Sequence, residues 1–117
     1  MAFLLDASAS LRARNFNKQK LFVQRIVNEI FPVSPDGNRI GVIQYSTSAK
    51  VEIHFDDYFV NKSLNNAIQN IPYLNGDSRI DLGLKLARDD LFKTSNGARE
   101  GVRKVGFLNF VTIFKIR

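Results

Sequence analysis

A short apolar stretch that ends in alternating acidic and hydroxyl residues constrains the fold of this 117-residue chain more than any other feature. Ala2-Phe3-Leu4-Leu5 is apolar throughout, which is typical of a central parallel strand that is buried on both faces. The stretch leads directly into Asp6-Ala7-Ser8-Ala9-Ser10, and a long amphipathic segment follows. The sequence therefore predicts a buried strand, a polar loop at its carboxyl end and then a helix.

Three side-chain oxygens at alternate positions of this loop are suited to meet at one point. Alternate residues of an extended chain face the same way, so we expect Asp6, Ser8 and Ser10 to converge above the end of the strand. Hard oxygen ligands with a single negative charge suit Mg²⁺ or Mn²⁺ better than Zn²⁺. Ser and Asp are also common helix N-caps, so the spacing alone leaves a metal site and a cap both open.

The rest of the chain alternates between strand and helix patterns. Apolar residues at helical spacing predict helices over residues 16–31, 60–71 and 80–91. Further strands are expected at 39–45, at 50–55 and over 102–114, which is mostly apolar and β-branched. The strict alternation in 50–55 favours an antiparallel edge strand. This order predicts one α/β domain, residues 1–117, with helices covering a sheet.

Four segments after the first loop have the sequence patterns of one known domain family, in the same order: Asn15–Val23, Arg39–Ser46, Gly76–Ala87 and Gly101–Leu108. In that family they correspond to the first helix, the second strand, the second metal loop with the following helix, and the fourth strand. With the D-x-S-x-S of Asp6–Ser10, these segments resemble the von Willebrand factor type A domain family. The resemblance runs from residue 2 to about residue 108, and 109–117 is a divergent tail.

The resemblance implies both a fold and a role. The implied fold is doubly wound and Rossmann-like, with a mostly parallel sheet in the order 3-2-1-4 whose third strand is an antiparallel edge. The implied role is extracellular adhesion, in which a protein partner completes the coordination of a bound Mg²⁺ with its own carboxylate. That partner would be a matrix protein such as collagen, or a cell-surface protein.

The resemblance also assigns residues to the metal-ion-dependent adhesion site of this family. It implies that Asp6, Ser8 and Ser10 hold the ion, and that Ser78 approaches from the second loop in place of the family's Thr. Ser78 fits equally well as a cap for a helix that begins at Arg79, with Asp81 completing a capping box. The other residues expected in a ligand-binding loop are Gly76, Asp77 and Arg79.

The third metal loop departs from the family pattern. The family places an Asp after the fourth strand in a T-D-G setting, whereas Val111 stands there in this sequence and T-D-G is absent. We therefore expect weak binding of Mg²⁺ or Mn²⁺. The later strands of the family fold are also expected to be missing, as in a domain truncated after its fourth strand. Residues 105–114 would then form an open sheet edge that favours self-association.

Composition excludes several other classes of function. The net charge is +6, but basic and aromatic residues do not interleave as in nucleic-acid binders. No run of apolar residues is long enough to span a membrane, and no signal peptide is recognised at Met1. Cysteine is absent, so disulfides are excluded. Asn61-Lys62-Ser63 is a glycosylation candidate at Asn61 if the chain is secreted.

Catalysis is not expected from this sequence. A phosphate-handling α/β enzyme would need a second carboxylate where Ser8 stands, and no phosphate-binding glycine loop is present. His54 is the only histidine and lies on the polar side of the expected edge strand. Besides metal-assisted adhesion, a metal-independent interaction module and a truncated product without function remain open.

Overall fold

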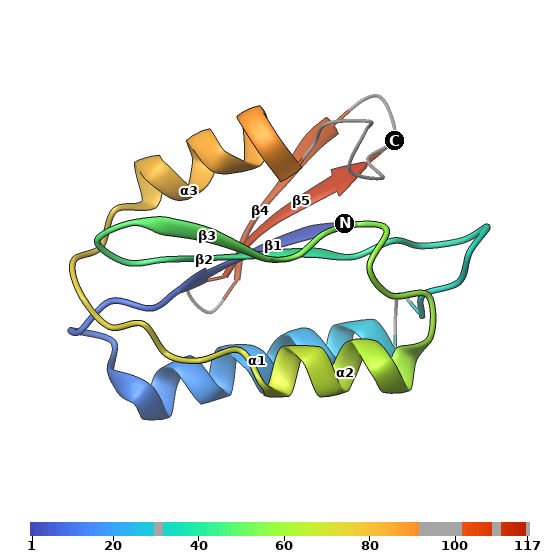
Figure 1. The fold of residues 1–117 in the computed structure, drawn as a ribbon, viewed down its shortest axis with the longest axis horizontal. Coiled ribbons are helices and arrows are strands. Elements are labelled where there is room, and N and C mark those ends of the chain that lie inside the picture. Colours follow the sequence, from blue (N-terminus) through green and yellow to red (C-terminus); the bar gives the residue numbers. More distant parts are fainter. Residues whose placement is uncertain (30–31, 92–101, 109–110, 117) are drawn as a thin grey trace.

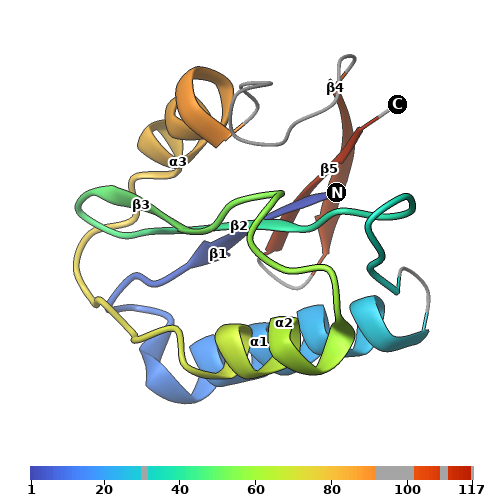
Figure 2. The same ribbon diagram turned by 45° about the vertical axis from the view of Figure 1, so that its right-hand side comes forward.

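The structure is a computed structural model that describes residues 1–29, 32–91, 102–108 and 111–116. Its central feature is a five-stranded sheet with helices on both faces (Figure 1). The elements in chain order are β1 (Ala2–Asp6), α1 (Arg12–Glu29), β2 (Gly41–Tyr45), β3 (Ala49–Ile53), α2 (Asn61–Gln69), α3 (Ile80–Leu86), the π-helical turn η1 (Ala87–Leu91), β4 (Val102–Leu108) and β5 (Val111–Ile116). Helices α1 and α2 cover one face of the sheet, and α3 covers the other (Figure 2).

The first three strands pair as the sequence predicts. β1 and β2 are parallel, with Phe3 opposite Val42 and Asp6 opposite Tyr45. β3 is antiparallel to β2 and lies at the edge of the sheet. The three helical segments expected from apolar spacing are also found, the last of them as α3 continued by η1.

The predicted strand order 3-2-1-4 is wrong. The sheet has the order β3-β2-β1-β5-β4, because the expected strand over 102–114 is two antiparallel strands. The chain reverses between Leu108 and Val111, which are paired, and β5 then runs antiparallel to β1. The sheet is therefore not mostly parallel: β1–β2 is the one parallel pair among the described strands.

The reversal has a physical reason that β-propensity does not reveal. β1 has only five residues, so a single strand over 102–114 would extend well past it and leave backbone groups unpaired. By folding back, the chain pairs β5 with β1 on one side and with β4 on the other. The expectation of one open edge over 105–114 is thus also wrong. β5 is an interior strand, so only the part of this segment in β4 lies at an edge of the sheet.

The side chains of β1 alternate between two apolar layers. Phe3 and Leu5 belong to the layer beneath α1 and α2, where they lie with Phe16 and Leu64. Ala2 and Leu4 belong to the layer beneath α3, whose other members are Ile43, Tyr45, Phe55, Ala87 and Leu91. The continuous apolar run of β1 is therefore explained, because residues 2–5 are completely buried and both faces of the strand are covered.

Polar side chains on one face of α1 join it to α2. The Lys20 ammonium donates to the carbonyl oxygens of Gln69 and Ile71, both at 3.0 Å, at the carboxyl end of α2. Two turns further along α1, Asn28 accepts a bond of 2.7 Å from Asn65. Lys20 is only 6% exposed, and this burial lowers its pKa. These bonds fix where α2 ends, and so where the following loop begins.

Candidate metal site

The loop after β1 brings its carboxylate and hydroxyls together. Asp6 is the last residue of β1, and its Oδ1 accepts a bond of 2.8 Å from the Ser8 backbone N–H. The hydroxyl oxygens of Ser8 and Ser10 lie 3.3 Å apart. Ser8 is buried and Ser10 is exposed, so the cluster runs from the core to the surface. The structure therefore brings Asp6, Ser8 and Ser10 together in one loop.

The second loop touches the first through the backbone. The Gly76 carbonyl accepts a bond of 2.8 Å from the Ala9 N–H, between the two serines of the first loop. The Asp77 N–H donates to the Thr47 hydroxyl at 3.0 Å, which connects this loop to the turn after β2. Gly76 has φ of 123°, and a Cβ atom there would lie 2.5 Å from the Thr47 hydroxyl oxygen. Glycine is thus required where the loops meet.

Ser78 lies in this second loop and does not cap a helix. The N-cap of α3 is Arg79, which makes no side-chain capping bond. Asp81 does not complete a capping box either, because its carboxylate binds the Arg79 guanidinium through bonds of 2.9 and 2.8 Å. The capping interpretation of Ser78 is therefore wrong. Ser78, Asp77 and Arg79 are exposed on the loop that touches Ala9.

Three polar residues that the sequence analysis missed hold these loops in place: Gln19, Gln44 and Tyr73. Tyr73 donates its hydroxyl to the Ser8 carbonyl at 2.7 Å, and its ring packs against Phe16. Gln44 is completely buried and donates to the Pro72 carbonyl at 2.7 Å. A polar residue inside an apolar strand was the available signal for Gln44, but its partner lies in a distant loop.

Asp6 is the one carboxylate of the cluster, and its charge acts on the tyrosine beside it. Tyr45 lies opposite Asp6 in the β1–β2 ladder. Burial, and then the negative charge of Asp6, raise the pKa of Tyr45, so its phenol stays neutral. In the part of the chain that the structure describes, no three His, Cys, Asp or Glu residues come together. One carboxylate and two hydroxyls form a hard, oxygen-only donor set, which fits Mg²⁺ or Mn²⁺.

A comparison with protein families decides what this arrangement belongs to. The profile of the von Willebrand factor type A domain, abbreviated VWA, matches residues 1–109. The chain belongs to this family. The match covers both loops of the VWA domain and most of its sheet, which agrees with the resemblance drawn from the motifs.

Two curated relatives and one solved structure are similar to this VWA domain. Human matrilin-1 is 33% identical over 108 residues, which are 92% of this chain and 22% of matrilin-1. The collagen alpha-1(XII) chain of Notophthalmus viridescens is 32% identical over 108 residues, 92% of this chain and 12% of that one. Proximal thread matrix protein 1 from the mussel byssus was solved with a zinc-occupied MIDAS motif, and it matches this chain with a TM-score of 0.76 and 26% sequence identity. The match covers 83% of this chain and 26% of the byssal chain. The VWA domain thus spans less than a quarter of the two curated relatives.

The position of the missing third-loop Asp lies in the sheet of this VWA domain. Val111 is the first residue of β5 and is paired with Leu5 of β1. Val111 thus begins a new strand after the chain reversal, rather than lying in a loop. The described residues therefore offer ligands from the first loop, with Ser78 on the second.

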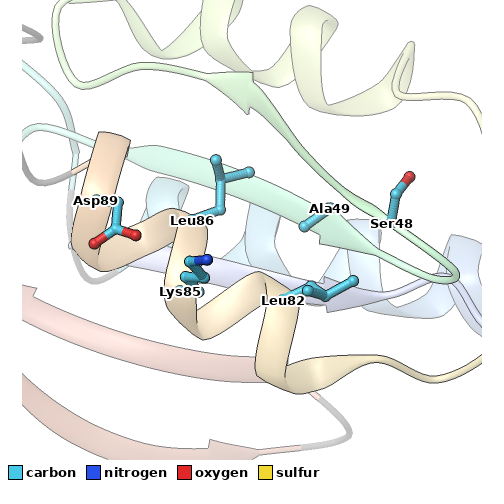
Figure 3. A pocket seen from close by; sticks show the side chains of 6 residues that line it. All are labelled: Ser48, Ala49, Leu82, Lys85, Leu86 and Asp89. Atoms are coloured by element: carbon cyan, nitrogen blue, oxygen red, sulfur yellow. The ribbon is translucent and has the colours of Figure 1, made fainter.

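Two further surfaces lie outside the candidate metal site. A groove of about 310 Å³ runs between the start of β3 and α3 (Figure 3), lined by Ser48, Ala49, Leu82, Lys85, Leu86 and Asp89. Asn61, the glycosylation candidate, begins α2 and is half-buried, and its side-chain oxygen accepts a bond of 2.8 Å from the Val33 N–H. No helix among the described residues has the length and apolarity needed to cross a membrane.

Proposed function

We propose that this VWA domain is a protein-binding module that holds Mg²⁺ or Mn²⁺ through Asp6, Ser8 and Ser10, with Ser78 approaching from the second loop. The observation that carries the proposal is the convergence of the first three residues, with Ser8 N–H on the Asp6 carboxylate and the two hydroxyls 3.3 Å apart. The hard donor set and the MIDAS motif of the byssal relative both support it.

The proposed partner is an extracellular matrix protein that offers a carboxylate. Mg²⁺ prefers six oxygen ligands, so the few protein ligands here leave positions for water and for a partner group. With Asp6 as the only charged ligand, a bound divalent ion keeps a net positive charge and attracts an acidic side chain. Relatives that are a collagen chain and a byssal matrix protein support an extracellular setting and make collagen the first ligand to test.

Binding of the metal is proposed to be weak, because Val111 stands in place of a third-loop carboxylate. Isothermal titration with Mn²⁺ tests this on the wild type, on Asp6→Ala and on Asp36→Ala, an exposed carboxylate outside the loops. We expect affinity weaker than micromolar that is lost in Asp6→Ala and kept in Asp36→Ala. Submicromolar binding that survives Asp6→Ala would overturn the assignment. Val111→Asp alone should leave the affinity low, since residue 111 lies within β5.

A metal-independent interaction module is the alternative, and the place of Val111 in β5 favours it. The two proposals differ in the effect of a chelator on binding to a collagen-coated surface. Loss of binding in EDTA, with recovery in Mg²⁺, supports the metal-assisted role, whereas binding that EDTA does not change supports the alternative. Catalysis is not part of either proposal. His54 lies half-buried in the turn after β3, where its backbone N–H donates to the Asp57 carboxylate at 2.8 Å.

Self-association through β4 is a further part of the proposal. β4 is the last strand of the sheet among the described strands, and an edge strand can be a template for pairing with another chain. Light scattering after size exclusion should show dimers whose fraction rises with concentration. Phe107→Lys adds a charge to this edge and should restore the monomer, whereas Leu21→Lys, at a position 54% exposed on α1, should not. A wild-type chain that stays monomeric at all concentrations would overturn this part.

A further inference from the structure

We infer that Gln19 is a positioning residue that completes the open edge of β1 at Asp6 and so holds the Asp6 carboxylate ready for a metal ion. The inference deepens the proposed function and rests on it for the metal. Gln19 lies on α1, in the helix that covers one face of the sheet, and it is only 3% exposed. The sequence motif of the metal loop does not include it.

The need for such a residue follows from how β1 is paired. β5 pairs with β1 only as far as Leu5, which lies opposite Val111. On the other edge β1 stays paired to its end, with Asp6 opposite Tyr45 and the Ala7 N–H donating to the Tyr45 carbonyl at 2.8 Å. Successive residues of a strand direct their N–H and C=O groups to opposite edges. Since Ala7 is directed toward β2, the backbone groups of Asp6 are directed toward the edge that β5 no longer covers.

Gln19 supplies the pairing that β5 leaves out. Its Oε1 accepts from the Asp6 N–H at 2.9 Å, and its Nε2 donates to the Asp6 carbonyl at 2.8 Å. A primary amide carries one acceptor and one donor side by side, as the peptide group of a neighbouring strand does. The side chain of Gln19 therefore replaces a strand at the one residue that both ends β1 and begins the metal loop. Without it, two part-buried backbone groups would lose their protein partner.

These two hydrogen bonds matter for metal binding because they fix the position of Asp6, the charged metal ligand. The neighbouring Ala7 is bonded to β2, the backbone of Asp6 is bonded to Gln19 on the opposite edge, and the Asp6 Oδ1 accepts from the Ser8 N–H. A ligand whose backbone and rotamer are fixed loses little freedom on binding, which raises affinity. Gln19 occupies a position on α1 where apolar spacing from Phe16 and Val23 calls for an apolar residue. Packing alone would be satisfied by an apolar residue at this position, so the buried amide of Gln19 indicates a positioning role.

The test compares Gln19→Leu with Val23→Ala, which also changes a buried side chain of α1 but one that cannot form hydrogen bonds to Asp6. Both variants are confirmed as folded by circular dichroism and are then titrated with Mn²⁺. We expect Gln19→Leu to weaken Mn²⁺ binding at least tenfold, and Val23→Ala to change it by less than threefold. Equal losses in the two variants would show a merely structural role and overturn the inference.

A second readout separates this inference from the proposed function. Amide hydrogen exchange of Asp6, measured without metal, should be at least tenfold faster in Gln19→Leu than in Val23→Ala. If the wild type binds no Mn²⁺, the proposed metal site fails, and the positioning of Asp6 by Gln19 is decided by this exchange alone. Unchanged protection of the Asp6 amide in Gln19→Leu would overturn the inference whatever the metal result.

Discussion

The two edges of β1 show how differently one strand is completed on its two sides. Toward β2 the pairing is parallel and continues through Asp6 into Ala7. Toward β5 it is antiparallel and stops at Leu5, and a side chain from α1 serves Asp6 instead. The apolar part of the strand accepts a neighbour of either direction, because burial of its side chains does not depend on strand polarity. The polar end, where the candidate site begins, depends on one particular partner at each edge.

The largest effect is expected from breaking the β2 edge. Ile43→Pro removes a backbone donor from a strand paired on both sides and a completely buried side chain of the layer under α3. The lost packing and the unpaired group together should cost about 3–8 kcal/mol, a large part of the stability of a typical domain. Urea unfolding followed by circular dichroism measures this. Ile43→Val keeps the donor and should cost only about 1 kcal/mol.

A smaller effect is expected from the β5 edge. Thr112 lies opposite Leu4 on one side and Phe107 on the other, so Thr112→Pro removes a ladder bond inside the sheet. We expect a loss of about 1–3 kcal/mol in the free energy of unfolding, while Thr112→Val, which keeps the N–H group, has little effect. If Thr112→Pro left the urea midpoint unchanged, β5 would not unfold together with β1, and the two edges would differ more than the structure indicates.

The β2 edge also predicts a dependence of stability on alkaline pH. The pKa of Tyr45 is raised in the folded chain by burial and by the charge of Asp6, so an unfolded chain loses this proton first. The stabilisation is therefore complete below about pH 10 and is lost as pH rises above that value, by at most about 1.4 kcal/mol per pH unit. Tyr45→Phe should abolish this fall, and Asp6→Asn should make it shallower. A fall that persists in Tyr45→Phe but vanishes in Tyr58→Phe would contradict the assignment.

The smallest effect concerns the point where the chain leaves the site for α1. Arg12 begins α1 with φ of 70°, a left-handed conformation that is costly for a side chain with a Cβ atom. Arg12→Gly relieves this strain but also raises the conformational entropy of the unfolded chain. We therefore expect the free energy of unfolding to rise by up to about 1 kcal/mol. Arg14→Gly, inside the helix, should instead lose about 1 kcal/mol. Thermal melts of the two variants should therefore shift in opposite directions.

The sequence predicted the part of the fold whose signals are local. The apolar run of 2–5, the helical spacing from Phe16 and the alternation in 50–55 each report on their own segment, and the elements they predicted are present. The prediction of one strand over 102–114 failed because β-propensity is the same whether a segment forms one strand or two. The direction and length of β5 depend on β1, which is about a hundred residues away in sequence and has only five residues to pair with.

In the candidate site too, the local contacts could be predicted from the sequence and the distant ones could not. Asp6, Ser8 and Ser10 lie within one short loop, so the contacts among them are local. The residues that hold this loop came from elsewhere, and Tyr73 lies 65 positions from the Ser8 carbonyl that it binds. A buried Gln or Tyr tells a reader of the sequence that some partner exists but does not identify the partner. The support of the site was therefore visible only after the fold was known.

The side chain of Gln44 has a consequence for how freely this domain can vary. It donates to Glu52 at 3.0 Å and to the Pro72 carbonyl at 2.7 Å, and it accepts from the Leu74 N–H at 3.2 Å. One side chain thus joins β2, β3 and the loop that leads to Gly76, and it uses both of its N–H groups and its oxygen to do so. Glu lacks the donors, Asn lacks the reach and Leu lacks both kinds of group. In a library that randomises this codon, we expect glutamine to be the residue that folded clones retain, although the position touches neither metal nor partner.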